Sequence, residues 1–384
     1  MTGTPPDSET YALKSAAVRD IPAPELNYRP PGPRNYRPRI GVIGAGGIVA
    51  SHLNAYRDAG WEVAAICNRS LAKAEARAAE FAPRARVMDR YEEILADPSI
   101  DVVDITPHPA DRLPIIEAAL KAGKHVLSQK PFVLDLSAGE RLVKLAVGNG
   151  VKLAVNQNGR WAPHLAWMRQ AVKAGLIGDV TSAHIAVHWN HGWIAGTPFE
   201  KMEDVILYDF AIHWFDFLTS ITGKRAISVF AMANKAHAQA AAVPLLAQVL
   251  VRLKEGQASL IFDGATPFGA RDTTFITGTR GSLSCEGPDL GQQTVTLTTA
   301  QGRTQPQLEG TWFNDGFRGA MGALLVAIED DTEPENGAVE NLQSLALAFA
   351  AIQSRRSGRE VNVGEATRIE IRQHFWDDPQ FPKA

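Results

Sequence analysis

The sequence is poor in cysteine, nearly balanced in charge and without any long apolar run. Two cysteines among 384 residues, Cys67 and Cys285, cannot form the disulfide framework of a small secreted domain, so we expect a reducing, cytoplasmic environment. The formal net charge of −3 and the lack of a long basic run argue against a nucleic-acid partner. No apolar stretch reaches the length of a membrane span, and the N-terminus lacks the pattern of a secretory signal, so no membrane partner is expected.

What is present favours a folded protein of two domains. The length exceeds that of a typical single domain, and a hydrophobic content of 45% is ordinary for a protein with a large core. Residues 1–38 are set apart by many prolines and by the tripeptide Tyr-Arg-Pro at 28–30 and 36–38. Because proline favours extended conformations, this Pro-rich segment is either a loose tail or an arm that packs across a neighbouring subunit with its tyrosines as anchors.

From residue 39 to about 155, short apolar segments alternate with helical patterns. Such alternation predicts an α/β fold, in which a doubly wound parallel sheet is joined by right-handed crossovers. Ligands bind such sheets beyond the C-terminal ends of the strands. The expected strands are 39–44, 62–67, 101–105, 124–128 and 152–156, and the expected helices lie near 48–58, 71–82, 110–122 and 135–149.

Residues 156–384 have a different pattern, which predicts an α+β domain with a large, mainly antiparallel sheet. We expect this domain to bind the substrate and to hold subunits together. Val249, Val251 and Leu253 alternate along one strand, and we expect them to leave apolar side chains on the face that no helix covers, so a homodimer or homotetramer is expected. The expected helices are 163–174, 203–221 and 337–356, and the expected strands are 179–188, 226–232, 247–253, 257–262, 273–277 and 293–299.

Three glycines, Gly44, Gly46 and Gly47, follow the first strand and precede a helical pattern that opens at Ile48. A backbone without side chains can come into contact with a ligand, and the first N–H groups of the following helix favour a pyrophosphate. Closely spaced glycines also serve ordinary turns, but their position between a strand and a helix strengthens the prediction of a dinucleotide site.

The second strand ends in Asn68, Arg69 and Ser70. An NAD-specific site commonly has a carboxylate here, on the hydroxyls of the adenosine ribose. Asn68 replaces it, and Arg69 and Ser70 are suited to a 2′-phosphate, so NAD and NADP both remain open. The turns that end the later strands supply further candidates for cofactor contacts: Thr106, Pro107, His108, Gln129, Lys130 and Asn158.

Three polar residues are candidates for the chemistry. Lys130 ends a predicted strand, where an ammonium group beside a nicotinamide can stabilise charge on a reacting hydroxyl. Asp209 and His213 are four residues apart in a predicted helix and so share one face, which Asp216 extends. Oxidation of an alcohol requires a base for the hydroxyl proton, and imidazole suits that task when a carboxylate orients it. The same residues also fit the polar side of an ordinary helix.

Further histidines and tryptophans surround this region in the sequence. His184, His188 and His191 do not converge with cysteines or carboxylates in a ligand pattern, so no metal site is expected. Strand periodicity places His188 and Asn190 on one face, as possible hydrogen-bonding groups for a substrate. Tryptophans form sugar-binding walls or pack in cores, and the candidates are Trp161, Trp189 and Trp193.

Three motifs together resemble the glucose–fructose oxidoreductase, inositol 2-dehydrogenase and rhizopine catabolism (Gfo/Idh/MocA) family. They are Ile43-Gly-Ala-Gly-Gly-Ile48 with His52, the run from Ala122 to Gln129-Lys130-Pro131, and Tyr208-Asp-Phe-Ala-Ile-His213-Trp-Phe-Asp216. The resemblance covers about residues 39–360 and implies an N-terminal Rossmann domain. It makes His213 the base, Asp209 its polar partner or a substrate ligand, and Lys130 the link between cofactor and substrate.

The resemblance also implies a function, although the chain departs from the family pattern at Val49, Asp111 and Gln129. Gln129 stands where the family has glutamate, which makes the surroundings of Lys130 less negative. Arg160 and Trp161 belong to a motif that follows the last Rossmann strand and are candidates for substrate contacts with Asn158. The run 156–164 resembles enzymes related to D-apiose dehydrogenase, so we expect NAD(P)-dependent oxidation of a sugar or polyol, such as D-apiose or a similar aldose. The alternatives are a nicotinamide-assisted non-redox conversion of a sugar and a catalytically silent dinucleotide-binding regulator.

Overall fold

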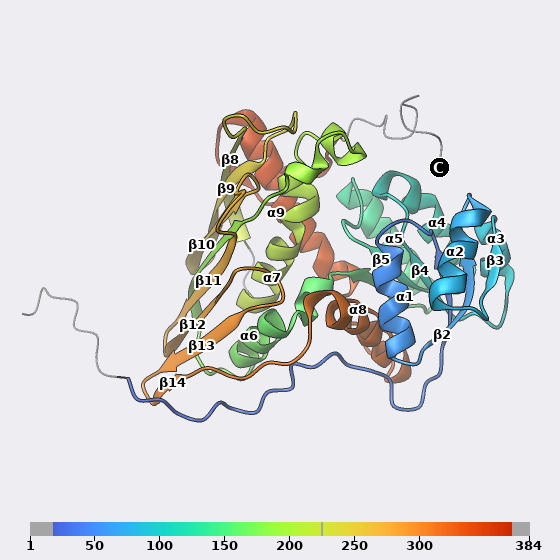
Figure 1. Ribbon diagram of the computed structural model, residues 1–384, viewed down its shortest axis with the longest axis horizontal. Coiled ribbons are helices and arrows are strands. Elements are labelled where there is room, and N and C mark those ends of the chain that lie inside the picture. Colours follow the sequence, from blue (N-terminus) through green and yellow to red (C-terminus); the bar gives the residue numbers. More distant parts are fainter. Residues whose placement is uncertain (1–17, 224–225, 371–384) are drawn as a thin grey trace, which may run out of the picture.

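The computed structural model describes residues 18–223 and 226–370. Two sheets lie side by side with helices between and around them (Figure 1). The first belongs to the N-terminal half of the chain and the second to the C-terminal half, as the change of sequence pattern predicts. Within the described residues, no helix is both long enough and apolar enough to cross a membrane.

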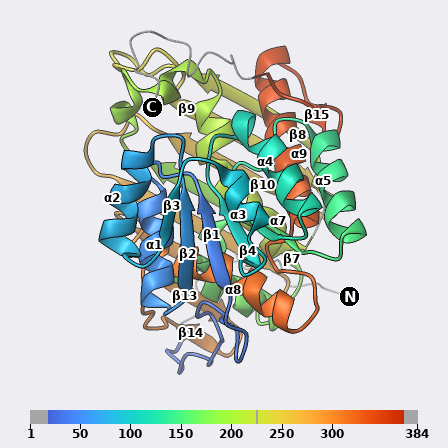
Figure 2. The same ribbon diagram turned by 90° about the vertical axis from the view of Figure 1, so that its right-hand side faces the viewer.

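The first sheet is parallel and has six strands in the order β3-β2-β1-β4-β5-β6, of which β3, β2, β1 and β4 are labelled side by side in Figure 2. Its central strands β1, β4 and β5 are buried along nearly their whole length because helices cover both faces. The order reverses between β1 and β4, which places a crevice for ligands at their C-terminal ends. The strands are β1 (Arg39–Ile43), β2 (Glu62–Cys67), β3 (Arg86–Met88), β4 (Val102–Ile105), β5 (His125–Gln129) and β6 (Leu153–Asn156).

Five helices alternate with these strands, and the expected Rossmann fold is confirmed. The sequence patterns missed β3 and α3, which are too short to show a period. Asp135 caps α5 by accepting hydrogen bonds from the Ser137 and Ala138 amides at 2.8 and 3.3 Å. The helices are α1 (Val49–Asp58), α2 (Leu71–Phe81), α3 (Tyr91–Ala96), α4 (Pro109–Lys121) and α5 (Leu136–Gly148).

Helix α8 (Trp312–Glu329), which the sequence analysis did not predict, packs against the first sheet although it comes late in the chain. Its Phe317, Met321, Leu324 and Leu325 join the core formed by β1, β2 and α1. Glycines repeat along the helix, which weakens its helical signal in the sequence. The structure explains them by close contact: a Cβ on Gly319 would lie 2.1 Å from Cγ of Trp161.

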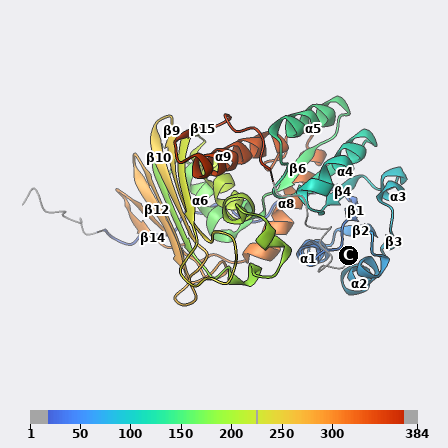
Figure 3. The same ribbon diagram turned by 90° about the horizontal axis from the view of Figure 1, so that it is seen from above.

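The second sheet has nine strands in the order β14-β13-β12-β11-β7-β10-β9-β8-β15, and it is antiparallel except between β7 and β10. Helices α6 (Pro163–Lys173), α7 (Ile212–Thr222) and α9 (Ala338–Ser357) cover one face, while no element covers the other in the described chain (Figure 3). The strands are β7 (Val180–His188), β8 (Ala226–Asn234), β9 (Leu246–Leu253), β10 (Gly256–Asp263), β11 (Arg271–Gly278), β12 (Gly281–Gly287), β13 (Thr294–Thr299), β14 (Gly302–Thr304) and β15 (Val361–Asn362).

The apolar residues predicted for the open face of this sheet lie on the other face. Val249, Val251 and Leu253 are buried under the helices, and Leu250 of the same strand is 59% exposed on the open face. The alternation was correct, but strand period alone does not say which set a helix covers. Exposed apolar side chains still gather on the open face, namely Phe230, Met232, Leu250 and Phe275.

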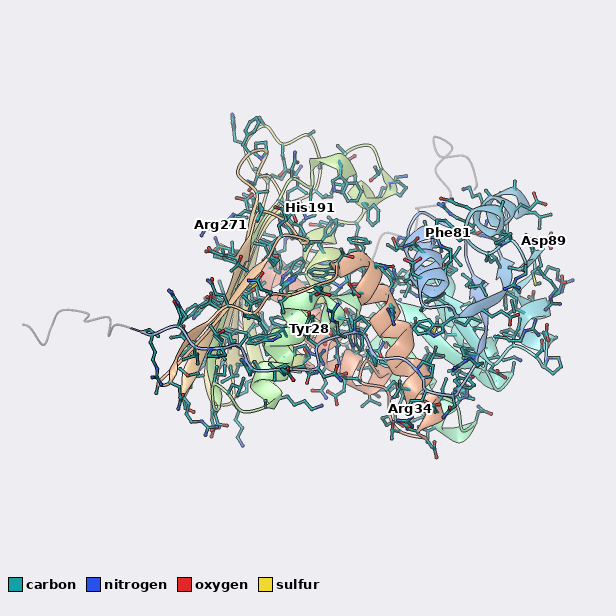
Figure 4. All side chains as sticks on the ribbon, turned by 60° about the horizontal axis from the view of Figure 1, so that its bottom comes forward. Tyr28, Arg34, Phe81, Asp89, His191 and Arg271 are labelled. Carbon is teal, nitrogen blue, oxygen red and sulfur yellow. The ribbon has the colours of Figure 1, made fainter. Side chains whose placement is uncertain are left out.

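Residues 18–38 run in extended form along their own chain, from the edge of the second sheet to the first (Figures 1 and 4). The Ile21 amide donates to the Arg303 carbonyl at 2.8 Å, next to β14. Tyr28 accepts a hydrogen bond from the Glu309 amide at 3.0 Å, and Glu329 of α8 accepts from the amides of residues 34–36. The described part of the Pro-rich segment therefore bridges both halves of one subunit. Residues 1–17 lie outside the described chain.

Candidate active site

The glycine turn leaves room for a ligand where β1 meets α1. Gly44 has a φ of +106°, and a Cβ there would lie 2.3 Å from the Thr106 hydroxyl, so only glycine fits. In contrast, a Cβ on Gly46 or Gly47 would meet no described atom within 4 Å. Ile48 precedes α1 without capping it through its side chain. The Val49 and Ser51 amides donate to the Gly46 and Ile48 carbonyls at 3.3 and 3.0 Å, so the start of α1 attracts an anion chiefly through the positive end of its dipole.

A cleft of about 540 Å³ opens beside this turn, along the C-terminal ends of β1, β2 and β4. Its lining includes seven of the residues predicted to contact a cofactor: Gly44, Gly46, Asn68, Arg69, Thr106, Pro107 and His108. The other predicted cofactor residues, Gly47, Ile48, Gln129, Lys130 and Asn158, lie outside the described lining of the cleft.

At the end of β2, the side chain of Asn68 braces the glycine turn. Its Oδ1 accepts from the Ala45 amide at 3.1 Å, and its Nδ2 donates to the Ser70 carbonyl at 3.0 Å. Arg69 and Lys73 both line the cleft at this end. Asp89, also in the lining, supplies a carboxylate from the end of the neighbouring strand on the outer side of the first sheet (Figure 4).

Lys130 follows the last residue of β5 and reaches across to the second half of the chain. Its Nζ lies 3.2 Å from Oδ2 of Asp209 and donates to the Asp209 carbonyl at 2.9 Å. The two side chains are only 15% and 13% exposed, so their attraction is less screened than that of a surface pair. The structure thus joins the predicted lysine and aspartate directly.

His213 lies in the first turn of α7, but it does not pair with Asp209. A π-helical turn (Ile206–Phe210) carries Asp209 and ends before α7 begins, so the predicted single helix over 203–221 is interrupted. The predicted partnership of Asp209 with His213 is replaced by the contact with Lys130, because the π-helical turn alters the helical spacing.

The His213 ring stands against aromatic residues. Its centroid lies 5.8 Å from that of Trp312 and 6.2 Å from that of Trp214, both nearly perpendicular. Nδ1 is buried without a hydrogen-bond partner among the described residues, which leaves Nε2 as the nitrogen that can meet a substrate. Burial, and secondly the positive charge of Lys130, hold the pKa of His213 well below its usual value of 6.5. The imidazole is therefore neutral near pH 7 and able to accept a proton.

Of the other predicted substrate residues, Asn158 lies beside this group and Arg160 and Trp161 do not face it. Asn158 Oδ1 accepts from Trp312 Nε1 at 3.3 Å. The Arg160 guanidinium donates twice to the buried carboxylate of Asp216, at 2.6 and 2.8 Å. One edge of the guanidinium is therefore occupied by this ion pair in the core. Trp161 is 4% exposed and packs under α8.

The contacts of His188 and Asn190 in the described chain are with other residues than Lys130, Asp209 and His213. His188 is on the open face of the second sheet, with Nδ1 3.7 Å from Asp263 Oδ2. Asn190 is exposed and accepts a hydrogen bond from the Gly192 amide at 2.9 Å. Of the three candidate tryptophans, Trp189 packs on Trp214 and Trp193 is 53% exposed.

Three residues near the site have no role there that the sequence predicted. Trp312 joins His213 to Asn158, but it belongs to the unpredicted helix α8. His191 stacks on Phe210, the neighbour of Asp209, at 4.1 Å between ring centroids, and burial lowers the pKa of His191 to about 4. Arg112 of α4 is fully buried and donates to the Pro131 carbonyl. No motif marked these residues; an arginine on the apolar side of a helix was the one available signal.

Within residues 18–223 and 226–370, no cluster of histidine, cysteine or carboxylate side chains has the arrangement of a metal site. Both cysteines are buried and unpaired.

Two models of one protein family match the sequence. Residues 38–157 match the Gfo/Idh/MocA model described as an oxidoreductase family with an NAD-binding Rossmann fold. Residues 165–284 match the model of the Gfo/Idh/MocA C-terminal domain. Together these matches cover the first sheet and, in the second sheet, β7 to β11 with the start of β12, and they include Lys130, Asp209 and His213.

Individual relatives span most of the chain. It is 26% identical over 333 residues to an inositol 2-dehydrogenase from Rhizobium meliloti, covering 85% of this chain and 99% of the relative. It is 24% identical over 339 residues to a D-apiose dehydrogenase from Paraburkholderia graminis, covering 84% and 88%. A solved oxidoreductase from Agrobacterium radiobacter, in complex with NAD+, L-tartaric acid and magnesium, shares the fold with a TM-score of 0.75 at 22% identity, covering 86% and 99%.

Proposed function

The chain belongs to the Gfo/Idh/MocA family of NAD-binding oxidoreductases, and on that premise we propose that it oxidises a hydroxyl group of a sugar or polyol. The observation that carries the proposal is the contact between Lys130 and Asp209 beside a neutral His213. Removal of a hydroxyl proton requires a base, an ammonium group stabilises the charge that develops on the oxygen, and the Asp209 carboxylate holds that ammonium group in place. A catalytically silent regulator would have no need of this constellation.

The residues present fit a nicotinamide dinucleotide. The glycine turn offers an unobstructed backbone at Gly46 and Gly47 and the uncapped start of α1, and both suit a pyrophosphate. The cleft continues to Asn68 and Arg69, where an adenosine ribose would lie. Arg69 and Lys73 admit a 2′-phosphate at this end and do not require one, so NAD and NADP are both accommodated.

Each side chain has a task at a stated atom. Lys130 Nζ hydrogen-bonds the reacting oxygen and stabilises the negative charge that develops there. His213 accepts the hydroxyl proton at Nε2, and burial of the ring keeps it neutral for this purpose. Asp209 fixes the Lys130 ammonium group by two contacts. When bound, the nicotinamide supplies the hydride acceptor.

For the substrate we propose D-apiose or a similar aldose, with polyols such as inositols as the next class. The support is the resemblance of residues 156–164 and the names of the relatives, which include a D-apiose dehydrogenase and an inositol 2-dehydrogenase. A second candidate is a non-redox conversion, in which a tightly held nicotinamide oxidises and re-reduces the same sugar.

The test is a panel of aldoses, inositols and sugar acids, assayed with NAD+ and with NADP+. We expect reduced nicotinamide to accumulate, seen by its absorbance, with at least one member of the panel. Product formation without net reduction would favour the non-redox candidate. Cofactor binding without any turnover across the panel would favour the silent regulator.

A further inference from the structure

A row of buried polar side chains runs from the core of the first sheet to Lys130. Its members are Tyr56 and His52 of α1, Asp104 of β4, Gln129 at the end of β5 and Asn156 at the end of β6. All are buried, four of them with no exposed surface. We call these five residues the buried network. They stand among apolar side chains such as Ile40, Val42 and Leu127, where burying polar groups is costly unless each finds a partner.

Four contacts join the buried network in series and a fifth connects it to Lys130. The Tyr56 hydroxyl donates to Asp104 Oδ2 at 2.7 Å, and His52 Nδ1 lies 2.7 Å from the same oxygen. Asn156 Nδ2 lies 3.3 Å from His52 Nε2 and donates to Gln129 Oε1 at 2.8 Å. The Lys130 amide also donates to Gln129 Oε1, at 2.8 Å.

The protons of the buried network can be assigned in one consistent way. Gln129 Oε1 accepts from the Lys130 amide, so the Asn156 atom that faces it must be the donor nitrogen. That nitrogen also faces His52 Nε2, which must therefore accept. His52 then carries its ring proton on Nδ1 and donates it to Asp104. Each hydrogen bond of the buried network therefore has one donor and one acceptor that cannot be exchanged. Exchanging them in one bond would place two donors or two acceptors against each other in the next.

We propose that the buried network positions Lys130, by holding its backbone amide and so the direction in which its side chain leaves the sheet. Nζ makes its contacts with Asp209 from that starting point. His52 and Tyr56 belong to the helix that begins at the glycine turn, so the same contacts tie Lys130 to the element that faces the cofactor. His52, Asp104 and Asn156 are positioning residues, and the proposal rests on the proposed function of Lys130.

The test compares Asn156→Leu with Asn336→Leu. Asn156→Leu removes the donor to Gln129, and we expect kcat to fall about 10- to 100-fold, as small misplacements of catalytic groups do. Asn336 is a matched control, because its buried Nδ2 donates to the Val155 and Ala320 carbonyls at 2.8 and 3.1 Å and, among the described residues, to no side chain of the buried network. Asn336→Leu should lower the thermal midpoint similarly while leaving kcat unchanged.

A second background separates positioning from a general loss of stability. In Lys130→Met, Asn156→Leu should cause little further loss of kcat, because both changes act through the same side chain. His52→Phe keeps an aromatic ring against Phe317, whose ring centroid lies 4.5 Å from that of His52. We expect it to show the same pattern as Asn156→Leu with a smaller loss of kcat. It replaces Asn156→Leu in the test if that variant does not fold.

Three results would refute either the positioning role of the buried network or the proposed function of Lys130, and they distinguish the two. A kcat loss in Asn156→Leu and His52→Phe no larger than in Asn336→Leu would refute the positioning role alone. An equal fold-loss from Asn156→Leu in the wild-type protein and in the Lys130→Met variant would also refute it. Normal kcat in Lys130→Met itself would instead overturn the proposed function of Lys130, and the positioning role with it.

Discussion

The positive charge of Lys130 acts on two neighbouring groups in opposite ways, attracting the Asp209 carboxylate and disfavouring the protonated form of His213. Asp209 is attracted to the ammonium group, whereas His213 loses proton affinity because of it. The carboxylate that the sequence suggested as a partner of the histidine thus holds the lysine. This arrangement makes the protonation of His213 depend on Lys130, and the dependence has a definite sign.

Lys130→Met should shift the acid limb of the pH profile of kcat/KM to higher pH. With the positive charge gone, protonated imidazole is less opposed and the pKa of His213 rises toward its usual value. Activity that depends on neutral His213 is then lost at a higher pH as the solution is acidified. The measurement is kcat/KM on the residual activity, followed from acidic to mildly alkaline pH. An acid limb that stays in place, or moves down, would contradict the electrostatic link.

Gly46→Val should abolish dinucleotide binding while preserving the fold. No described atom lies within 4 Å of a Cβ at this position, so the protein itself has room for a side chain, and only a ligand at the turn would be displaced. Calorimetric titration with NAD+ measures the affinity, and the thermal midpoint checks the fold. Unchanged affinity would show that the pyrophosphate lies elsewhere.

Single residues were predictable where a motif fixes the backbone position and unpredictable where a distant partner decides the role. Lys130 and His213 follow from local runs of sequence. Arg160 also belonged to a motif, yet its buried partner Asp216 lies 56 residues away, and nothing local reveals that pairing. For His188, the alternation of side chains along the strand predicted which residues share its face of the sheet, but not whether helices cover that face.

At the scale of elements, α8 shows how glycines that close packing requires can weaken the helical signal in a sequence. Gly316, Gly319 and Gly322 each lie against another segment, and a Cβ on them would come within 2.7, 2.1 and 2.0 Å of its atoms. These glycines let α8 sit directly on residues 158–161 and on the extended N-terminal segment. The same glycines lower helix propensity, so the local signal and the tertiary requirement conflict. Helices that contain no glycine, such as α2 and α4, were predicted nearly to their ends.

Gly319→Ala should destabilise the protein by about 1–3 kcal/mol, because the added methyl group must displace the Trp161 ring. Gly148→Ala is the matched control at the end of α5, since its Cβ would meet no described atom within 4 Å. There we expect a change within about 1 kcal/mol, in the stabilising direction. Denaturant unfolding gives both free energies. Equal effects of the two substitutions would show that α8 tolerates a wider spacing than the structure indicates.

At the scale of the whole molecule, the open face of the second sheet has no covering element in the described chain. Phe230, Met232, Leu250 and Phe275 expose 38–59% of their surface there, and the helices occupy the opposite face (Figure 3). Contiguous apolar surface on a sheet favours burial against a partner. We propose a second copy of this chain as that partner, because the same strands would supply a self-complementary surface.

Light scattering at micromolar concentration should therefore give the mass of a dimer or tetramer. Leu250→Asp should shift the mass toward the 41.6 kDa monomer, because a desolvated carboxylate at the interface is unfavourable. Val147→Asp is the matched control, since Val147 is also an exposed apolar residue, 72% accessible, but lies on α5 away from the second sheet. The control should leave the mass unchanged. A monomer mass for the wild-type protein would refute the proposed assembly.

The measurement that tests the central claim most directly is the turnover of His213→Asn on the sugar or polyol that the wild-type protein oxidises. The account predicts a fall in kcat of about 10²- to 10⁴-fold, the contribution of a positioned general base. Dinucleotide affinity should be retained, because His213 does not line the cleft at the glycine turn. Near-normal turnover of His213→Asn would contradict the account, since the hydroxyl proton would then have to leave by another group.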